Sequence, residues 1–171
     1  MFSGAHLHLL VNHAPIFGCV FAFALLVCSY FAASDVLRRT AFVILVMTAG
    51  AGLLADKTGE PAEDAIRGYP GVKRQIIHDH EEMGEKAWIL AAVLGAASLG
   101  MLGRYRRRPV PNGLATAMVF ATAFVGGAMI YTGLLGGRIR HTEVRPGATD
   151  ADAMVIEPRR QRPSESPQAN P

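Results

Sequence analysis

The chain has 171 residues, of which 50% are hydrophobic and 18% are charged, with a formal net charge of +3 and a mean hydropathy of +0.23. This composition is more apolar than that of an ordinary soluble domain and favours a membrane protein. The arginines stand in short groups beside apolar runs rather than along a polar face. That pattern suits a lipid bilayer and argues against nucleic-acid binding.

Four apolar segments predict an all-α fold, an integral membrane four-helix bundle that occupies residues 1–141 as one domain. A membrane-spanning helix needs about 20 apolar residues, with roughly 17 to 25 as the working range. Segments of nearly this length lie at about residues 7–33, 40–55, 81–103 and 114–137. Small residues recur in them and let helix backbones approach closely in lipid, so we expect one compact bundle.

The connections between the segments predict an orientation in the membrane. The first and third connections, "SDVLRRT" and "RYRRRPVPN", are short and basic, which places them in the cytoplasm by the positive-inside rule. Both termini and the acidic loop 56–86 are then periplasmic, although arginines after the fourth segment oppose this arrangement. Residues 142–171 are rich in Pro, Ser, Gln and charge, which predicts a disordered C-terminal tail.

The histidines all lie outside the four apolar cores. Three lie before Ala14, where the apolar core of the first segment begins, two precede the third segment and one follows the fourth: His6, His8, His13, His78, His80 and His141. Four crossings bring these three places to one side of the membrane, whichever way the chain is inserted. We therefore treat the six histidines as candidates for one site.

A haem b is the cofactor that we expect there. Imidazole ligates haem iron, copper and zinc, and helix bundles place such ligands on facing helices. His13 and His80 are the predicted axial pair, and His141 with His8 is the pair for a second haem. His6 and His13 are seven residues apart and share a face if that stretch is helical. The two cysteines form no C-x-x-C-H motif, so a c-type haem attachment is not supported.

Two further features fit a flat anionic cofactor. Gly84 follows His80 by four residues, which predicts open space beside the imidazole. Arg138 and Arg140 stand beside His141 in "RIRH", and guanidinium groups are suited to haem propionates.

A zinc or copper site is the competing interpretation. It uses two H-x-H pairs, His6 with His8 and His78 with His80, and "HDHEE" adds carboxylates to the second pair. Residues two apart on a helix point to different sides. Such a pair therefore chelates one ion only where the backbone is extended or irregular.

The segments "HLLVNHAPI" and "HDHEEMGEKAW" resemble a family of small bacterial predicted membrane proteins, classed as a domain of unknown function. Its members begin with a His, four residues, a second His, one residue and Pro-Ile, and carry another His before the third helix. The matching positions are His8, His13, Pro15, Ile16 and His80. The chain differs from the pattern at Asn12 and Ala14 and has an extra His6. The resemblance implies a four-helix integral membrane protein that binds haem or a metal at these histidines, and the layout is similar to small haem-b four-helix membrane cytochromes.

These features lead to one functional hypothesis and two alternatives. The first is a haem-b membrane protein that exchanges electrons with a quinol or with a periplasmic partner such as a respiratory complex or a cytochrome. The second is a non-catalytic accessory subunit of a larger membrane complex, since the helices carry small-residue faces and no catalytic set is recognisable. The third is a zinc- or copper-binding membrane protein. We assign no catalytic residue and expect an electron-transfer or accessory subunit rather than a stand-alone enzyme.

Overall fold

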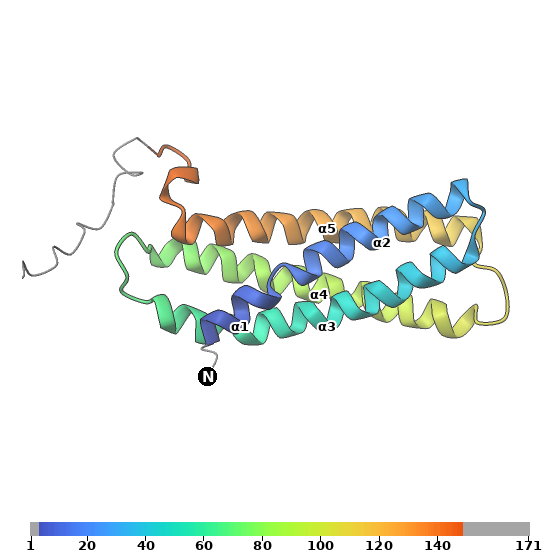
Figure 1. Ribbon diagram of the computed structural model, residues 1–171, viewed down its shortest axis with the longest axis horizontal. Helices are drawn as coiled ribbons and strands as arrows, with labels where there is room; N and C mark the ends of the chain where they lie inside the picture. The colour runs from blue at the N-terminus through green and yellow to red at the C-terminus, as the bar shows by residue number, and fades with distance from the viewer. Residues whose placement is uncertain (1–3, 149–171) are drawn as a thin grey trace, which may run out of the picture.

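The computed structural model describes residues 4–148, which form a bundle of long antiparallel helices (Figure 1). The elements are α1 (Gly4–Val11), α2 (Ala14–Phe31), α3 (Asp35–Ile66), α4 (Arg74–Arg104), α5 (Asn112–Arg140) and the short 3-10 helix η1 (Thr142–Val144). Within residues 4–148 there is no strand. The predicted all-α class is therefore confirmed, with α1 and α2 together forming the first of the four members.

Four helical stretches are long and apolar enough to cross a membrane, as the sequence predicts. They are Gly4–Phe31, Asp35–Ile66, Arg74–Arg104 and Asn112–Arg140. At 1.5 Å per residue, a 30-residue helix is about 45 Å long, whereas the hydrocarbon core of a bilayer is roughly 30 Å thick. The helices therefore continue beyond their apolar cores.

The predicted bounds 40–55 and 81–103 are too short, because hydropathy marks only the apolar part of a helix. α3 continues to Ile66 and α4 begins at Arg74, so most of the predicted loop 56–86 is helical. Ion pairs one turn apart support the polar ends, with Glu63 bonded to Arg67 at 3.2 Å and Glu82 to Lys86 at 2.6 Å. The true turn is confined to residues 67–73.

The first helix is broken, although the sequence predicts one helix over 7–33. α1 ends at Val11 and α2 begins at Ala14, with Pro15 in its first turn. Proline has no N–H to donate and its ring obstructs the preceding helical turn, so a helix tends to restart there. α1 instead packs along α3, where Gly4 lies against Pro61. Because of the break, His6 and His13 do not lie on one continuous helix.

The bundle interior combines a few large apolar side chains with small residues at the close contacts. Leu26, Phe42 and Leu45 are fully buried. A Cβ added to Gly95 of α4 would lie only 2.6 Å from the Cβ of Ala49 on α3. Larger apolar side chains, including Phe120 and Phe124, are exposed on the outside. The small residues therefore set the helix spacing, as expected for helices that pack in lipid.

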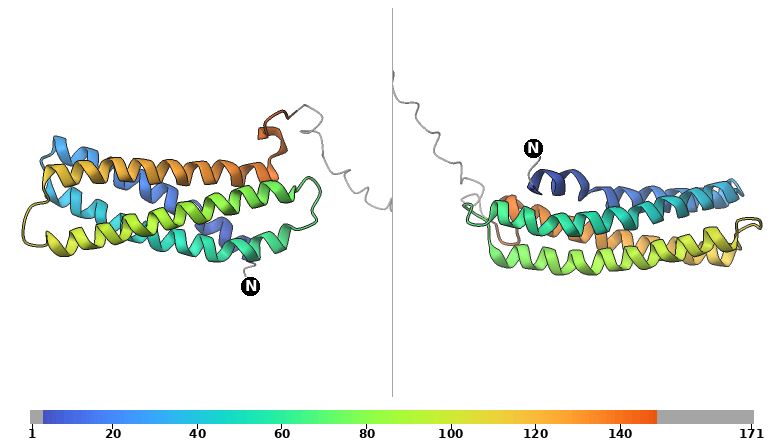
Figure 2. Two further views of the ribbon diagram at one scale, coloured as in Figure 1. Left: turned by 180° about the vertical axis from the view of Figure 1, so that it is seen from behind. Right: turned by 90° about the horizontal axis from the view of Figure 1, so that it is seen from below.

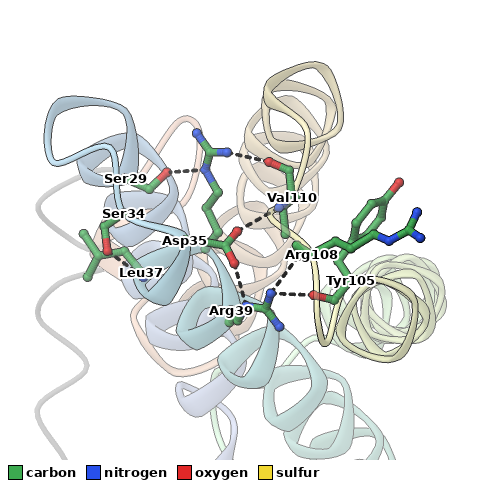
Figure 3. A network of polar contacts seen from close by, with 9 residues as sticks. Ser29, Ser34, Asp35, Leu37, Arg39, Tyr105, Arg108 and Val110 are labelled. Carbon is green, nitrogen blue, oxygen red and sulfur yellow. Dashed lines mark hydrogen bonds and ion pairs between the residues drawn. The ribbon is translucent and has the colours of Figure 1, made fainter.

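The two basic connections meet at one end of the bundle (Figure 3). There Arg38 and Arg39 of α3, together with Asp35, bind the α4–α5 loop, and we call these three residues the arginine clasp. The Asp35 carboxylate accepts hydrogen bonds from Arg39 Nε at 2.7 Å and from the Val110 N–H at 2.8 Å. Arg39 also donates to the carbonyl oxygen of Tyr105 and, at 2.8 Å, to that of Arg108. These contacts fix the backbone of the loop.

Arg38 completes the clasp from a buried position, with 8% of its surface exposed. Its guanidinium donates to the Val110 carbonyl and to Asn112 Oδ1, both at 2.7 Å, and to Ser29 Oγ at 3.3 Å. In the sequence, Arg38 is only one of the basic residues that predict the membrane orientation. The structure shows that it also satisfies polar groups inside the bundle.

The C-terminal segment begins with an ordered turn, so the tail predicted over 142–171 starts too early. After η1, Arg145 folds back and donates to the carbonyl oxygens of Arg138 at 2.8 Å and Ile139 at 3.0 Å. It also donates to the Gly71 carbonyl at 2.8 Å, which ties the end of α5 to the α3–α4 turn. The rest of the predicted tail, residues 149–171, lies outside the described residues.

Candidate functional site

The segments that carry the six histidines meet at one end of the bundle, opposite the arginine clasp. α1, the end of α3, the start of α4 and the end of α5 lie together there (Figures 1 and 2). The prediction that these segments lie at one end is therefore confirmed. Which histidines touch one another depends on the positions of their side chains.

His8 of α1 and His80 of α4 form the one ring contact between histidines within residues 4–148. Their ring centroids are 6.4 Å apart and the ring planes are nearly perpendicular, at 84°. Both side chains are partly buried, whereas the other four histidines are exposed. We call these two residues the histidine pair.

Each ring of the histidine pair is held through Nδ1 by another helix. His8 Nδ1 lies 3.1 Å from the Ala55 carbonyl oxygen and 3.1 Å from Thr58 Oγ1, both on α3. His80 Nδ1 lies 2.9 Å from the Thr132 carbonyl oxygen on α5. A carbonyl oxygen only accepts, so Nδ1 donates its hydrogen and each Nε2 keeps a lone pair. A backbone carbonyl that orients the ring in this way is the usual second partner of a metal-binding histidine.

Gly136 of α5, rather than Gly84, provides the space beside His80. A Cβ on Gly136 would lie 2.9 Å from His80 Cε1, so a side chain there would displace the imidazole. A Cβ on Gly84 would instead meet the methyl group of Thr132 at 3.7 Å, with no His80 atom among its nearest neighbours. The prediction for Gly84 is wrong, because the spacing on α4 does not reveal which face α5 covers.

The predicted pairing of His13 with His80 does not occur as a ring contact. His13 is exposed at the start of α2, and its Nδ1 is hydrogen-bonded with Asn12 Oδ1. The break between α1 and α2 separates it from the face that carries His8. His8 therefore takes the place beside His80.

His141 makes no ring contact with either member of the histidine pair in the described part of the chain. It is exposed, and its Nδ1 lies 2.9 Å from Glu143 Oε1. The pKa of the Glu143 carboxyl is lowered by a hydrogen bond from its own backbone N–H and by the contact with His141. The predicted second axial pair, His141 with His8, is not formed as a ring contact in the described part of the chain.

The two H-x-H pairs do not have the backbone that chelation needs. His6 and His8 are both in α1, and His78 and His80 are both in α4. Residues two apart on a helix point to different sides, and His6 and His78 are exposed while their partners are partly buried. In residues 4–148 no group of three or more His, Cys, Asp or Glu side chains could hold a metal ion.

The predicted propionate partners, Arg138 and Arg140, lie in the last turn of α5. They follow Thr132, the partner of His80, by roughly 9 to 12 Å along the helix axis. Arg138 is partly buried, and the Arg140 guanidinium lies 5.6 Å from the centre of the Tyr69 ring. Their role toward a cofactor stays a prediction.

A separate cavity of about 180 Å³ lies where α3 ends and α4 begins. It is lined by Glu63, Arg67, Gly68, Val72, Arg74 and Ile77. None of its lining residues is a histidine, so this cavity is distinct from the histidine pair.

Sequence reasoning located the end of the bundle that holds the site but missed the residues that orient the imidazoles. Those residues are Ala55, Thr58, Thr132 and Gly136. Two of them act through backbone carbonyls, which any residue possesses, so no residue type could have identified them.

Searches against protein-family models, curated proteins and solved structures find no match for this chain. The resemblance to the family of predicted membrane proteins therefore stays a prediction. The functional assignment depends on the geometry of the histidine pair.

Proposed function

We propose that the chain is a multi-pass membrane protein of the bacterial inner membrane. The proposal is that it binds one haem b between His8 and His80 and exchanges electrons with a quinol or a periplasmic partner. The histidine pair carries the proposal, because two imidazoles from different helices are in contact and both Nδ1 atoms are already bonded to backbone carbonyls.

The distribution of apolar side chains supports membrane insertion. Large apolar residues such as Leu10, Phe31 and Phe120 are mostly exposed, while glycine, alanine and small polar residues occupy many close helix contacts. In water such an outer surface would be strongly unfavourable, whereas lipid chains accommodate it. The orientation with the histidine end outward follows from the short basic connections at the other end.

The spacing of the histidine pair supports coordination of one iron from both sides. Two imidazoles that held one metal ion between them would have ring centres about 6 Å apart, from two metal–nitrogen distances of about 2.1 Å and roughly 1 Å from each nitrogen to its ring centre. The observed centroid separation is 6.4 Å. The histidine pair therefore has a spacing at which two imidazoles would hold one metal ion between them.

The number of ligands favours haem over zinc or copper. A structural zinc ion takes four protein ligands, and a catalytic one usually takes three. The histidine pair supplies two, and no group of three ligands exists in residues 4–148. Haem brings four nitrogens of its own, so the two imidazoles of the histidine pair would be enough to hold it.

A bound haem would supply one-electron transfer, and the chain's own residues would hold and tune it. The carbonyls of Ala55 and Thr132 fix each imidazole in the tautomer with a free Nε2 and make it more basic. Arg138 and Arg140 are the candidates to neutralise the propionates. The site lies where the helices leave their apolar cores, which gives access to a partner in water or at the membrane surface.

The accessory-subunit hypothesis explains the same pair as packing. Perpendicular aromatic rings often lie 4.5 to 7 Å apart without any ligand. It predicts a colourless protein that co-purifies with a larger complex.

Visible spectroscopy separates these functions. The full chain, expressed with haem precursor supplied and purified in detergent, should show a bis-histidine b-type spectrum in oxidised and reduced forms. A haem assay and elemental analysis of the same sample should give about one haem per chain. A protein that stays colourless, or that keeps its haem when His8 and His80 are both replaced by alanine, would contradict the proposal. Stoichiometric zinc or copper instead of haem would favour the metal alternative.

A further inference from the structure

The end of the bundle opposite the histidines carries exposed arginines with little acidic charge near them. We define the arginine rim as Arg104, Arg106, Arg107 and Arg108, which are all exposed. Asp35 is the one carboxylate in or beside the connections at this end, and it is already bonded to Arg39 and to the Val110 N–H. Within residues 4–148 no ion pair involves a rim arginine. The rim therefore presents uncompensated positive charge.

The arginine clasp holds the backbone that displays this charge. Arg39 binds the carbonyl oxygens of Tyr105 and Arg108, which bracket Arg106 and Arg107. Arg38 binds the carbonyl of Val110, whose side chain is buried. Because the loop is fixed from inside, a ligand that binds the rim would not have to order the backbone first.

Exposed apolar side chains lie at the same end of the bundle as the rim. The α2–α3 connection lies at the same end (Figure 1), and there Phe31 is 89% exposed and Val36 is 70% exposed. Tyr30 donates its hydroxyl to the Asn112 carbonyl at 3.2 Å, in the manner of an interfacial aromatic residue with one polar end. Apolar side chains this exposed beside guanidinium groups are typical of a membrane–water interface.

We propose that the arginine rim binds the phosphate groups of anionic phospholipids such as phosphatidylglycerol. A guanidinium forms paired hydrogen bonds with phosphate oxygens, and basic groups beside a membrane helix are attracted to anionic headgroups. This inference rests on the membrane insertion in the proposed function and is independent of haem. The basic end of the bundle would then bind a ligand in addition to setting the orientation of the chain in the membrane.

The test compares two double variants that remove the same charge from opposite ends. R106Q/R107Q alters the rim, and K73Q/R74Q alters two exposed cations at the start of α4. Native mass spectrometry of the full chain, purified in detergent with equal phosphatidylglycerol and phosphatidylcholine, measures the preference for the anionic lipid. At about fivefold per arginine, R106Q/R107Q should reduce the preference roughly 25-fold, and K73Q/R74Q should retain it.

Further arms identify the ligand. Inorganic phosphate at a millimolar concentration should not displace phosphatidylglycerol from the wild-type protein, and added salt should weaken its binding. An unchanged preference in R106Q/R107Q, an equal loss in K73Q/R74Q, or displacement by inorganic phosphate would overturn the inference. So would rim-dependent binding of a soluble acidic protein without lipid preference. Extraction by detergent but not by alkaline carbonate verifies membrane insertion separately, and circular dichroism verifies that both variants are folded.

Discussion

His8 and His80 belong to different helices, and their imidazole rings are held 6.4 Å apart at 84°, each through Nδ1 by a backbone carbonyl of a third or fourth helix. This arrangement combines α1, α3, α4 and α5 in one small region. Two flexible side chains are thereby fixed before any ligand binds, which reduces the entropy that binding would otherwise cost.

Replacing either member of the histidine pair should remove the haem. His8→Ala and His80→Ala each delete one axial ligand, and we expect at least a tenfold loss of haem affinity, because even orienting partners of such ligands contribute 10- to 100-fold. His13→Ala is the matched control and should keep the wild-type spectrum, since His13 is exposed and makes no ring contact with the pair. Haem titration followed by absorbance measures the change. If His13→Ala lost its haem and His8→Ala kept it, the result would favour His13 as the ligand, as predicted from the sequence.

Gly136→Ala should disturb the site while leaving the bundle folded. The added Cβ would lie 2.9 Å from His80 Cε1, so the ring must move away from the Thr132 carbonyl. Overpacking costs about 1 to 3 kcal/mol, and alanine in place of glycine in a helix returns roughly 1 kcal/mol. Thermal unfolding in detergent should therefore change little, while haem affinity falls. In Gly137→Ala the Cβ meets nothing within 4 Å, so wild-type affinity is expected, and equal effects of the two variants would contradict the proposed contact.

Arg38→Met should destabilise the bundle at its basic end. The substitution keeps an unbranched side chain but leaves the Val110 carbonyl and Asn112 Oδ1 without their donor. Hydrogen bonds from charged groups contribute about 1.5 to 3 kcal/mol each, so we expect a loss of roughly 3 kcal/mol. Arg107→Met, at an exposed position, should stay within about 0.5 kcal/mol of wild type. Equilibrium unfolding in mixed micelles gives both values, and similar stabilities for the two variants would refute the buried role of Arg38.

Thr122→Val should stabilise the protein. Thr122 is fully buried in α5, and its hydroxyl has no hydrogen-bond partner in the described part of the chain. Valine has nearly the same shape and removes the buried hydroxyl, for a gain of up to about 1 kcal/mol. Thr48→Val is the control. The Thr48 hydroxyl donates to the Ile44 carbonyl at 2.8 Å, so this substitution removes a hydroxyl together with its hydrogen bond. A lower midpoint of unfolding for Thr122→Val would show that the hydroxyl has a partner in the membrane.

The histidine end illustrates how far pattern reasoning extends. The number of apolar segments is enough to predict that His8 and His80 lie at one end of the bundle, since each crossing reverses the chain. His13 makes no ring contact with His80, because the helix restarts at Pro15 and separates His13 from the face that carries His8. A proline near the start of an apolar run indicates where a helix begins but does not reveal that another helix precedes it. Gly84 failed for a related reason, since its neighbour depends on how α4 is rotated against α5.

The sequence by itself determined the helical class, the four apolar helices and the common end of the histidines, because hydropathy and connection length are local properties of the chain. The tertiary structure decided the contacts: the pairing of His8 with His80, the backbone carbonyls that orient them, the glycine beside them and the burial of Arg38. Such contacts depend on helix rotation, helix spacing and the direction of a break, and these follow from packing over the whole bundle.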